Sequence, residues 1–377
     1  MAARRILYLS GTRADFGLMA STLQRIHATP GLQVQVAATG THLSAAHGNT
    51  ITEVRASGLP VVAELPIDVL TRTGASMAIA IADVTRALTR LLESDRPDAL
   101  LLLGDRGEML AGAIAGLHVG VPVVHVHGGE RSGTVDEPVR HAISKLASYH
   151  FVATEGAGER LRAMGEAQER IFVTGAPGLD GLLALADSSR ADTMRALGLA
   201  DHEFVLVVFH PVVQQAAQAA QQTRSVIEAL NRVGLPVLWL EPNADAGARE
   251  ILAALDAQGL PPGSRRLAHL PRPLFASAMR HCAVMAGNSS SGIIEAASFG
   301  TPVVNIGKRQ HLRERGPNVL DVPAEAAAIE QALRAQHAHG AWPWENPWGD
   351  GHAGERIAQL LARIPLDASV LEKTNSY

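Results

Sequence analysis

The sequence predicts an α/β protein with two Rossmann-like lobes, each built on a doubly wound parallel sheet. One observation is length, because 377 residues exceed a single ordinary core and suit two domains of roughly 150 to 200 residues each. Another is the order of elements. Short apolar runs rich in β-forming residues alternate with longer Ala/Leu/Arg-rich helical stretches, which is typical of repeated βαβ units.

The expected strands fall into two series. In the first half they are residues 6–9, 33–38, 99–103, 121–125, 150–154 and 171–174, and residues 77–92 form a helix. In the second half they are residues 204–209, 236–240, 283–286 and 302–306. Residues 354–364 are amphipathic and predict a final helix. We therefore expect an N-terminal domain of residues 1–170, to which residues 354–377 return, and a C-terminal domain of residues 171–353.

The composition excludes several classes of function. With 47% hydrophobic and 19% charged residues and only short apolar runs, we expect a globular protein without membrane spans. A net charge of −4 with interspersed signs gives no basic surface for nucleic acid or a membrane. The single cysteine, Cys282, excludes an intrachain disulfide, and its apolar neighbours predict a buried thiol, so we expect a cytoplasmic location.

Polar motifs directly follow the expected strands of the first half, where parallel sheets collect their ligands. Arg13 can hold phosphate oxygens in a bidentate fork, or it can pair locally with Asp15. His42 occupies the same place after the next strand and is a candidate for substrate binding, although a lone His in such a loop is more often structural. Asp105 comes after an apolar run, which suits a partly desolvated base, although Asp is also a common helix N-cap. Arg106 beside it is a candidate for substrate binding.

Residues 125–141 are the most informative stretch. They combine three carboxylates, three histidines and two arginines with flexible glycines, which is unusual for a solvated loop. Glu130, Asp136 and His127 are candidates for proton transfer, and Arg140 for substrate binding. A proline in a first helical turn places Asp136 near a helix N-terminus. The His-x-His pattern lacks further ligands at a recognisable spacing, so we expect no metal.

In the second half, His210 follows the strand at 204–209. Small residues at 286–292 allow main-chain N–H groups at a helix start to approach a pyrophosphate, and Glu295 can accept from ribose hydroxyls. The alternative is an ordinary Ser N-cap with Glu in the first turns. The ligand-binding candidates of this half are Asn243, Asp245, Ser289, Ser290, Ser291, Gly292, Glu295 and Arg309.

Together, these motifs resemble the hydrolysing UDP-N-acetylglucosamine 2-epimerase family, in the branch that feeds sialic and legionaminic acid synthesis. The resemblance spans nearly the whole chain and is most specific at residues 128–136, 140–146 and 287–292. It implies a GT-B architecture, with two Rossmann-like domains, a cleft between them, and UDP held mainly by the C-terminal one. We expect a UDP-sugar as the partner, no cofactor, and a homodimer or homotetramer.

The resemblance also implies roles. Asp105, Glu130, Asp136 and His210 align with or lie beside the family's catalytic positions, while Arg13, Asn243, Ser289, Ser290, Glu295 and Arg309 match its nucleotide-binding ones. This chain departs from the family at His127, where Glu is frequent, so that His127, Glu130 or both take over its work. It departs again at Gly107, where Phe is common and the smaller residue can widen the sugar pocket.

The implied reaction is loss of UDP from C1 with removal of the C2 proton, to give a glycal. Water and a proton then add, which inverts C2. Three alternatives stay open: a non-hydrolysing epimerase that adds UDP back, a GT-B glycosyltransferase, and an inactive nucleotide-sugar sensor. The substrate is either UDP-N-acetylglucosamine or UDP-N,N'-diacetylbacillosamine.

Overall fold

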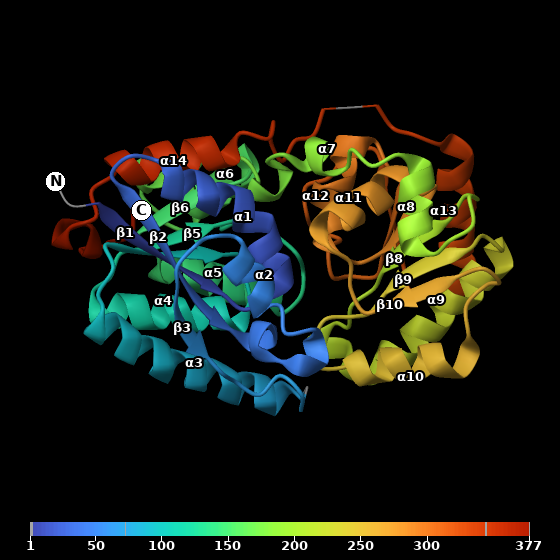
Figure 1. Ribbon diagram of the computed structural model, residues 1–377, viewed down its shortest axis with the longest axis horizontal. Helices are drawn as coiled ribbons and strands as arrows, with labels where there is room; N and C mark the ends of the chain where they lie inside the picture. Colours follow the sequence, from blue (N-terminus) through green and yellow to red (C-terminus); the bar gives the residue numbers. More distant parts are fainter. Residues whose placement is uncertain (1–2, 72, 344, 377) are drawn as a thin grey trace. The chain divides into compact units, whose positions relative to one another are not determined.

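The structure is a computed structural model that describes residues 3–71, 73–343 and 345–376. The chain forms two compact units. Unit 1 comprises the residues up to Glu130, Asp136–Asp180 and the segment from Trp348 onwards; unit 2 comprises Arg131–Val135 and Gly181–Pro347. Figure 1 labels the elements of each unit. Within the described residues we find no helix that could cross a membrane.

Unit 1 holds a parallel sheet of seven strands in the order β3-β2-β1-β4-β5-β6-β7. The strands are β1 (Arg4–Ser10), β2 (Leu32–Thr39), β3 (Val61–Leu65), β4 (Ala99–Leu103), β5 (Val123–Val126), β6 (Tyr149–Val152) and β7 (Ile171–Val173). From β1 to β3 the strands are added on one side of β1, and from β4 to β7 they are added on its other side. The order of the strands therefore reverses between β1 and β4, which pair in parallel at Ile6 and Ala99. This is a topological switch point, beyond which parallel sheets bind ligands.

Helices cover both faces of this sheet (Figure 1). Because strand side chains alternate, Ile6 and Tyr8 of β1 join one apolar core and Leu7 and Leu9 join the other. The first core includes α1 (Arg13–Ala28), α2 (Ile51–Ala56) and α14 (Ala353–Arg363). The second includes α3 (Gly74–Ser94), α4 (Gly107–Val119) and α5 (Asp136–Leu146). The turn after β6 leads into α6 (Glu155–Ala163).

Unit 2 repeats this plan with six parallel strands in the order β10-β9-β8-β11-β12-β13. They are β8 (Val205–Val208), β9 (Val237–Leu240), β10 (Arg265–Leu267), β11 (Val284–Gly287), β12 (Val303–Ile306) and β13 (Val319–Val322). One face is covered by α9 (Ala219–Val233), α10 (Ala248–Gln258) and α13 (Ala326–His339), the other by α8 (Arg190–Leu197) and α11 (Arg272–His281). The switch point of this sheet lies between β8 and β11.

The predicted α/β class with two doubly wound parallel sheets is confirmed. The crossing from unit 1 to unit 2 lies after Asp180 and not at residue 170, because β7 pairs with β6 and so belongs to the first sheet. Cys282 is buried as expected, and burial raises the pKa of its thiol to about 12.

Candidate functional site

The turn after β1 is held by hydrogen bonds to the carboxylate of Asp15. Thr12 N donates to Asp15 Oδ2 at 2.6 Å and Asp15 N donates to Thr12 Oγ1 at 3.2 Å, which makes a capping box at the start of α1. Ser10 also donates to Asp15, and Ser10 Oγ lies 2.9 Å from Nε2 of the fully buried His42. The other ring nitrogen of His42 lies 2.9 Å from Thr50 Oγ1. These contacts support a role of His42 in holding this turn.

Asp105 lies at the end of β4 and pairs with a buried arginine. The N-cap residue of α4 is Arg106, so Asp105 does not cap that helix. Its carboxylate forms an ion pair with Arg140, which is fully buried and donates through Nη1 to the Glu130 carbonyl at 2.9 Å. Burial alone would lower the pKa of Arg140, but the charges of Asp105 and Glu130 outweigh burial and raise it. A permanent positive charge therefore lies at the switch point of unit 1.

His127 and Glu130 form a second pair in the loop after β5. His127 has a left-handed backbone (φ +64°), which is uncommon outside glycine, and its amide donates to Phe151 O at 3.0 Å. Its Nδ1 contacts the carboxylate of Glu130, which is only 2% exposed, and its ring stacks on Trp348 with centroids 6.4 Å apart. An imidazole held against a carboxylate can pass protons.

Three further residues predicted for the site lie on nearby turns of unit 1. Arg13 Nε pairs with Glu53 Oε2 at 2.8 Å, while its Nη1 is buried without a hydrogen-bond partner among the described residues. Arg106 Nε lies 3.5 Å from a carboxylate oxygen of Glu108. Asp136 is the first residue of α5, as its position before a proline predicted.

In unit 2, Asn288 fastens the end of β11 to the end of β8. His210 N donates to Asn288 Oδ1 at 2.7 Å, and Asn288 Nδ2 donates to His210 O at 2.8 Å. The main-chain N–H of Asn243 donates to Nδ1 of His210 at 3.2 Å, so the neutral imidazole carries its proton on Nε2. Gly287 allows this close approach, because a Cβ there would lie 2.1 Å from Val208 O.

The serine-rich stretch starts α12 (Ser290–Ile294). Ser289 is its N-cap: Ser289 Oγ accepts from Ser291 N at 3.4 Å and lies 2.8 Å from Ser291 Oγ. A Cβ added at Gly292 would approach Val303 to 3.2 Å, so the glycine lets α12 pack against β12. Gly292 therefore has a packing role, whereas the serine hydroxyls at the start of α12 are uncharged hydrogen-bond donors for a ligand.

The remaining candidates of unit 2 are partly engaged with each other. Asn243 Nδ2 donates to Asp245 Oδ2 at 2.6 Å, and Asp245 is 7% exposed. Glu295 is 3% exposed and pairs with Arg272 at the start of α11. The carboxylate oxygens of Glu295 can also accept a hydrogen bond from a ribose hydroxyl.

The sequence did not single out several residues that shape these sites. Trp348 and Arg272 lie far along the chain from their partners, and no local pattern connects them. Asn288 stood inside the serine-rich motif, and its place at a strand end was the available signal. Arg309 Nη1 donates to Asn288 O at 3.3 Å. No group of His, Cys, Asp and Glu among the described residues has the arrangement of a metal site.

Comparison with solved structures supports the fold. A UDP-GlcNAc 2-epimerase from Neisseria meningitidis, solved with UDP-GlcNAc bound, superposes with a TM-score of 0.80 at 19% identity, covering 96% of this chain and 100% of that one. The UDP-GlcNAc 2-epimerase of Methanocaldococcus jannaschii, solved with UDP-GlcNAc and UDP, gives a TM-score of 0.81 at 18% identity, covering 95% and 99%.

Sequence comparison identifies the family. The profile described as UDP-N-acetylglucosamine 2-epimerase matches residues 24–362. The UDP-N,N'-diacetylbacillosamine 2-epimerase (hydrolyzing) of Legionella pneumophila is 46% identical over 375 residues, covering 99% of this chain and 100% of the relative. The GDP/UDP-N,N'-diacetylbacillosamine 2-epimerase (hydrolyzing) of Campylobacter jejuni is 30% identical over 338 residues, covering 88% and 87%. This chain therefore belongs to the UDP-N-acetylglucosamine 2-epimerase family.

Proposed function

We propose that this protein is a hydrolysing 2-epimerase that converts UDP-N,N'-diacetylbacillosamine to UDP and the free sugar inverted at C2. The observation that carries the proposal is the pair of contacts in unit 1, Asp105 with Arg140 and Glu130 with His127. Binding a nucleotide alone would not call for a partly buried Asp105 and a buried Glu130 in such contacts. The relative that is 46% identical over nearly the whole chain favours this substrate and a hydrolytic outcome.

The first half of the reaction is an elimination. The C1–O bond breaks and UDP leaves with its electron pair, which builds positive charge at C1 and acidifies the C2 proton. We assign removal of that proton to a carboxylate of unit 1, with Asp105, Glu130 and Asp136 as the candidates. Arg140 holds the Asp105 carboxylate in one orientation through their ion pair.

The second half is an addition to the resulting glycal. A water molecule supplies its hydroxyl to C1, and C2 takes a proton on the face opposite to the one deprotonated. The His127 and Glu130 pair suits this step, because an imidazole and a carboxylate in contact can relay the incoming proton. His210, with its proton on Nε2, is a further candidate donor. The net change consumes one water, and no atom changes its oxidation state overall.

We assign the nucleotide to unit 2. Main-chain N–H groups at the start of α12 and the hydroxyls of Ser289 and Ser290 are donors for the pyrophosphate, and Arg309 adds positive charge beside them. Glu295 is the candidate acceptor for ribose hydroxyls. Such donors stabilise a leaving pyrophosphate without a metal ion.

A turnover experiment in deuterium oxide tests the proposal. The purified protein is incubated with UDP-N,N'-diacetylbacillosamine and, separately, with UDP-N-acetylglucosamine, and products are followed by NMR. We expect UDP and a free 2-epimer carrying one deuterium at C2, formed faster from the first substrate. An epimer still attached to UDP would indicate the non-hydrolysing reaction. UDP release without deuterium at C2 would indicate glycosyl transfer or simple hydrolysis, and binding without turnover would indicate a sensor.

We also propose that the protein works in the cytoplasm as a homodimer or homotetramer. Cell fractionation tests the location. Sedimentation of the purified protein at several concentrations tests the assembly, and a monomer throughout would contradict this part of the proposal.

A further inference from the structure

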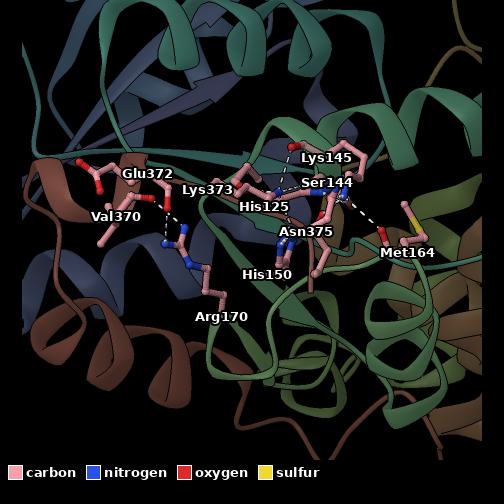
Figure 2. A network of polar contacts seen from close by, with 12 residues as sticks. His125, Ser144, Lys145, His150, Met164, Arg170, Val370, Glu372, Lys373 and Asn375 are labelled. Carbon is pink, nitrogen blue, oxygen red and sulfur yellow. Dashed lines mark hydrogen bonds and ion pairs between the residues drawn. The ribbon is translucent and has the colours of Figure 1, made fainter. Parts of the chain in front are cut away.

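The tail segment, residues 366–376, ends against α5, the helix that carries Asp136 and Arg140. Lys373 Nζ lies 3.0, 2.9 and 2.8 Å from the carbonyl oxygens of Ser144, Lys145 and Ala147. These carbonyls are at the C-terminal end of α5, where a helix leaves its last acceptors unsatisfied and carries partial negative charge. Figure 2 shows Lys373 beside Ser144 and Lys145. The ammonium thus caps the helix that starts at Asp136.

A buried ion cluster fixes Lys373 in this place. Glu166, whose side chain is fully buried, pairs with Lys373 at 2.5 Å, Lys145 at 2.7 Å and His150 at 2.8 Å; we call these four residues the clamp. Burial alone would raise the pKa of Glu166, but hydrogen bonds from its three partners outweigh burial and hold the pKa at about 2. The Glu166 carboxylate therefore stays ionised across the physiological pH range.

The same helix end is connected to Asp105 through one buried histidine. His125 Nε2 lies 2.7 Å from the Gly104 carbonyl, which can only accept, so Nε2 carries the proton. Burial lowers the pKa of His125 to about 3, so the ring is neutral and Nδ1 accepts from Ser144 Oγ at 3.0 Å. Ser144 thus contacts Lys373 through its carbonyl and His125 through its hydroxyl.

These contacts fix the peptide group that leads into Asp105. Gly104 N donates to Val126 O at 2.9 Å while Gly104 O accepts from His125, so both sides of this left-handed glycine (φ +78°) are held by β5. The packing is tight as well, because a Cβ at Gly128 would lie 2.8 Å from Ser144 Oγ. A shift at the end of α5 therefore has a direct route to Asp105.

We infer that Lys373 is a positioning residue for the acid–base groups of unit 1. It acts along two routes. Through the end of α5, it fixes the position of the helix and so of Asp136 and Arg140. Through Ser144 and His125, it fixes the Gly104 peptide group that precedes Asp105. The inference rests on the proposed function, in which these residues handle protons. In this way the tail segment supports catalysis by positioning other residues, without touching the substrate.

Kinetics of three variants test the inference. Lys373→Ala removes the ammonium, and we expect kcat to fall about tenfold while KM and the Kd for UDP change less than about twofold. Propylamine added to this variant supplies an ammonium at a side chain that is 17% exposed, and it should restore part of kcat. Ser144→Ala keeps the carbonyl but removes the hydroxyl that donates to His125, so it should lower kcat by a smaller factor, and the double variant should be no worse than Lys373→Ala.

The matched control is Glu372→Gln in the same segment, whose exposed side chain takes no part in the clamp, and it should leave kcat unchanged. The inference is overturned if Lys373→Ala lowers the unfolding temperature but keeps wild-type kcat in the folded protein, or if propylamine fails to restore any activity. If the wild-type protein turns over neither UDP-sugar, the proposed function has failed instead. If Lys373→Ala does not fold, the Ser144→Ala result decides: wild-type kcat would overturn the inference.

Discussion

The two units share a topology but carry different kinds of side chains after their central strands. In unit 1 the ends of β4 and β5 carry titratable side chains in direct contact, with Asp105 on Arg140 and Glu130 on His127. In unit 2 the ends of β8 and β11 carry an amide and hydroxyls, with Asn288 bonded to His210 and Ser289 capping α12. We therefore propose that the same sheet order serves proton transfer in unit 1 and binding of the pyrophosphate in unit 2.

The contrast teaches where function is encoded in this chain. A Rossmann sheet fixes where a ligand lies relative to the strand ends, but it does not fix the chemistry done there. That chemistry depends on a few side chains after β4, β5, β8 and β11. If the division is right, substitutions of Asp105, Glu130 or His127 in unit 1 change kcat, whereas substitutions at the start of α12 or of Arg309 in unit 2 change the affinity for UDP.

The largest expected effect comes from Glu130. Glu130→Gln keeps the shape but cannot accept a proton, so we expect kcat to fall about 10³-fold, in the range for loss of a general acid or base. The Kd for UDP, measured by calorimetry, should change less than about twofold. Glu169→Gln, an exposed glutamate of the same unit, is the control. An equal loss in kcat and in UDP affinity would break the division between the units.

A second prediction concerns the charges that stabilise unit 1. Glu166 has a pKa of about 2 in the folded protein against an ordinary 4.5, so its stabilising contribution is complete above pH 4.5 and is lost as pH falls toward 2. Glu166→Gln should therefore lower the free energy of unfolding by about 3 kcal/mol at pH 7. Urea unfolding at several pH values measures this. The gap between the two proteins should narrow below pH 4.5, and a gap independent of pH would contradict the prediction.

The sequence predicted the centre of each sheet better than its edges. Buried strands such as β4, with all five residues buried, read as apolar runs and were located correctly. The edge strands β3, β10 and β13 were missed, because their residues alternate between the core and solvent or are largely exposed. Their short alternating patterns are difficult to distinguish from loops.

A similar limit applies to the site. Asp105 and Arg140 were each proposed from the sequence, because both stand in polar stretches after strands. Their ion pair was not predicted, because 35 residues separate them and only the packing of α5 against α4 and β5 brings them together. The stacking of Trp348 on His127 connects even more distant segments. Position after a strand is a local signal, whereas pairing depends on the completed fold.

A third prediction sharpens the role of unit 2. Arg309→Met removes the positive charge beside the start of α12, so UDP should bind about tenfold more weakly while kcat at saturating substrate changes less than about threefold. Lys308→Met also removes one positive charge, at the neighbouring exposed residue, and should have little effect on the affinity for UDP. It therefore distinguishes a direct contribution of Arg309 from an effect of net charge. Equal losses in both variants would mean that net charge, and not the place of Arg309, governs binding.

The smallest expected effect concerns how unit 1 distinguishes sugars. Gly107 is the first residue of α4, and a Cβ added there would lie 2.7 Å from Ile81 Cγ1 of α3. Gly107→Phe, the residue common in the family by resemblance, should therefore displace Ile81 or enter the space beyond Asp105. We expect it to lower kcat/KM for UDP-N,N'-diacetylbacillosamine about fivefold relative to UDP-N-acetylglucosamine, because the substituents at C4 and C6 need room. In the double variant Gly107→Phe with Ile81→Ala, the phenyl ring can occupy the space left by the Ile81 side chain. This variant should therefore recover part of the preference for UDP-N,N'-diacetylbacillosamine. If both variants lower the two kcat/KM values equally, Gly107 affects the packing of α4 against α3 and plays no part in choosing the sugar.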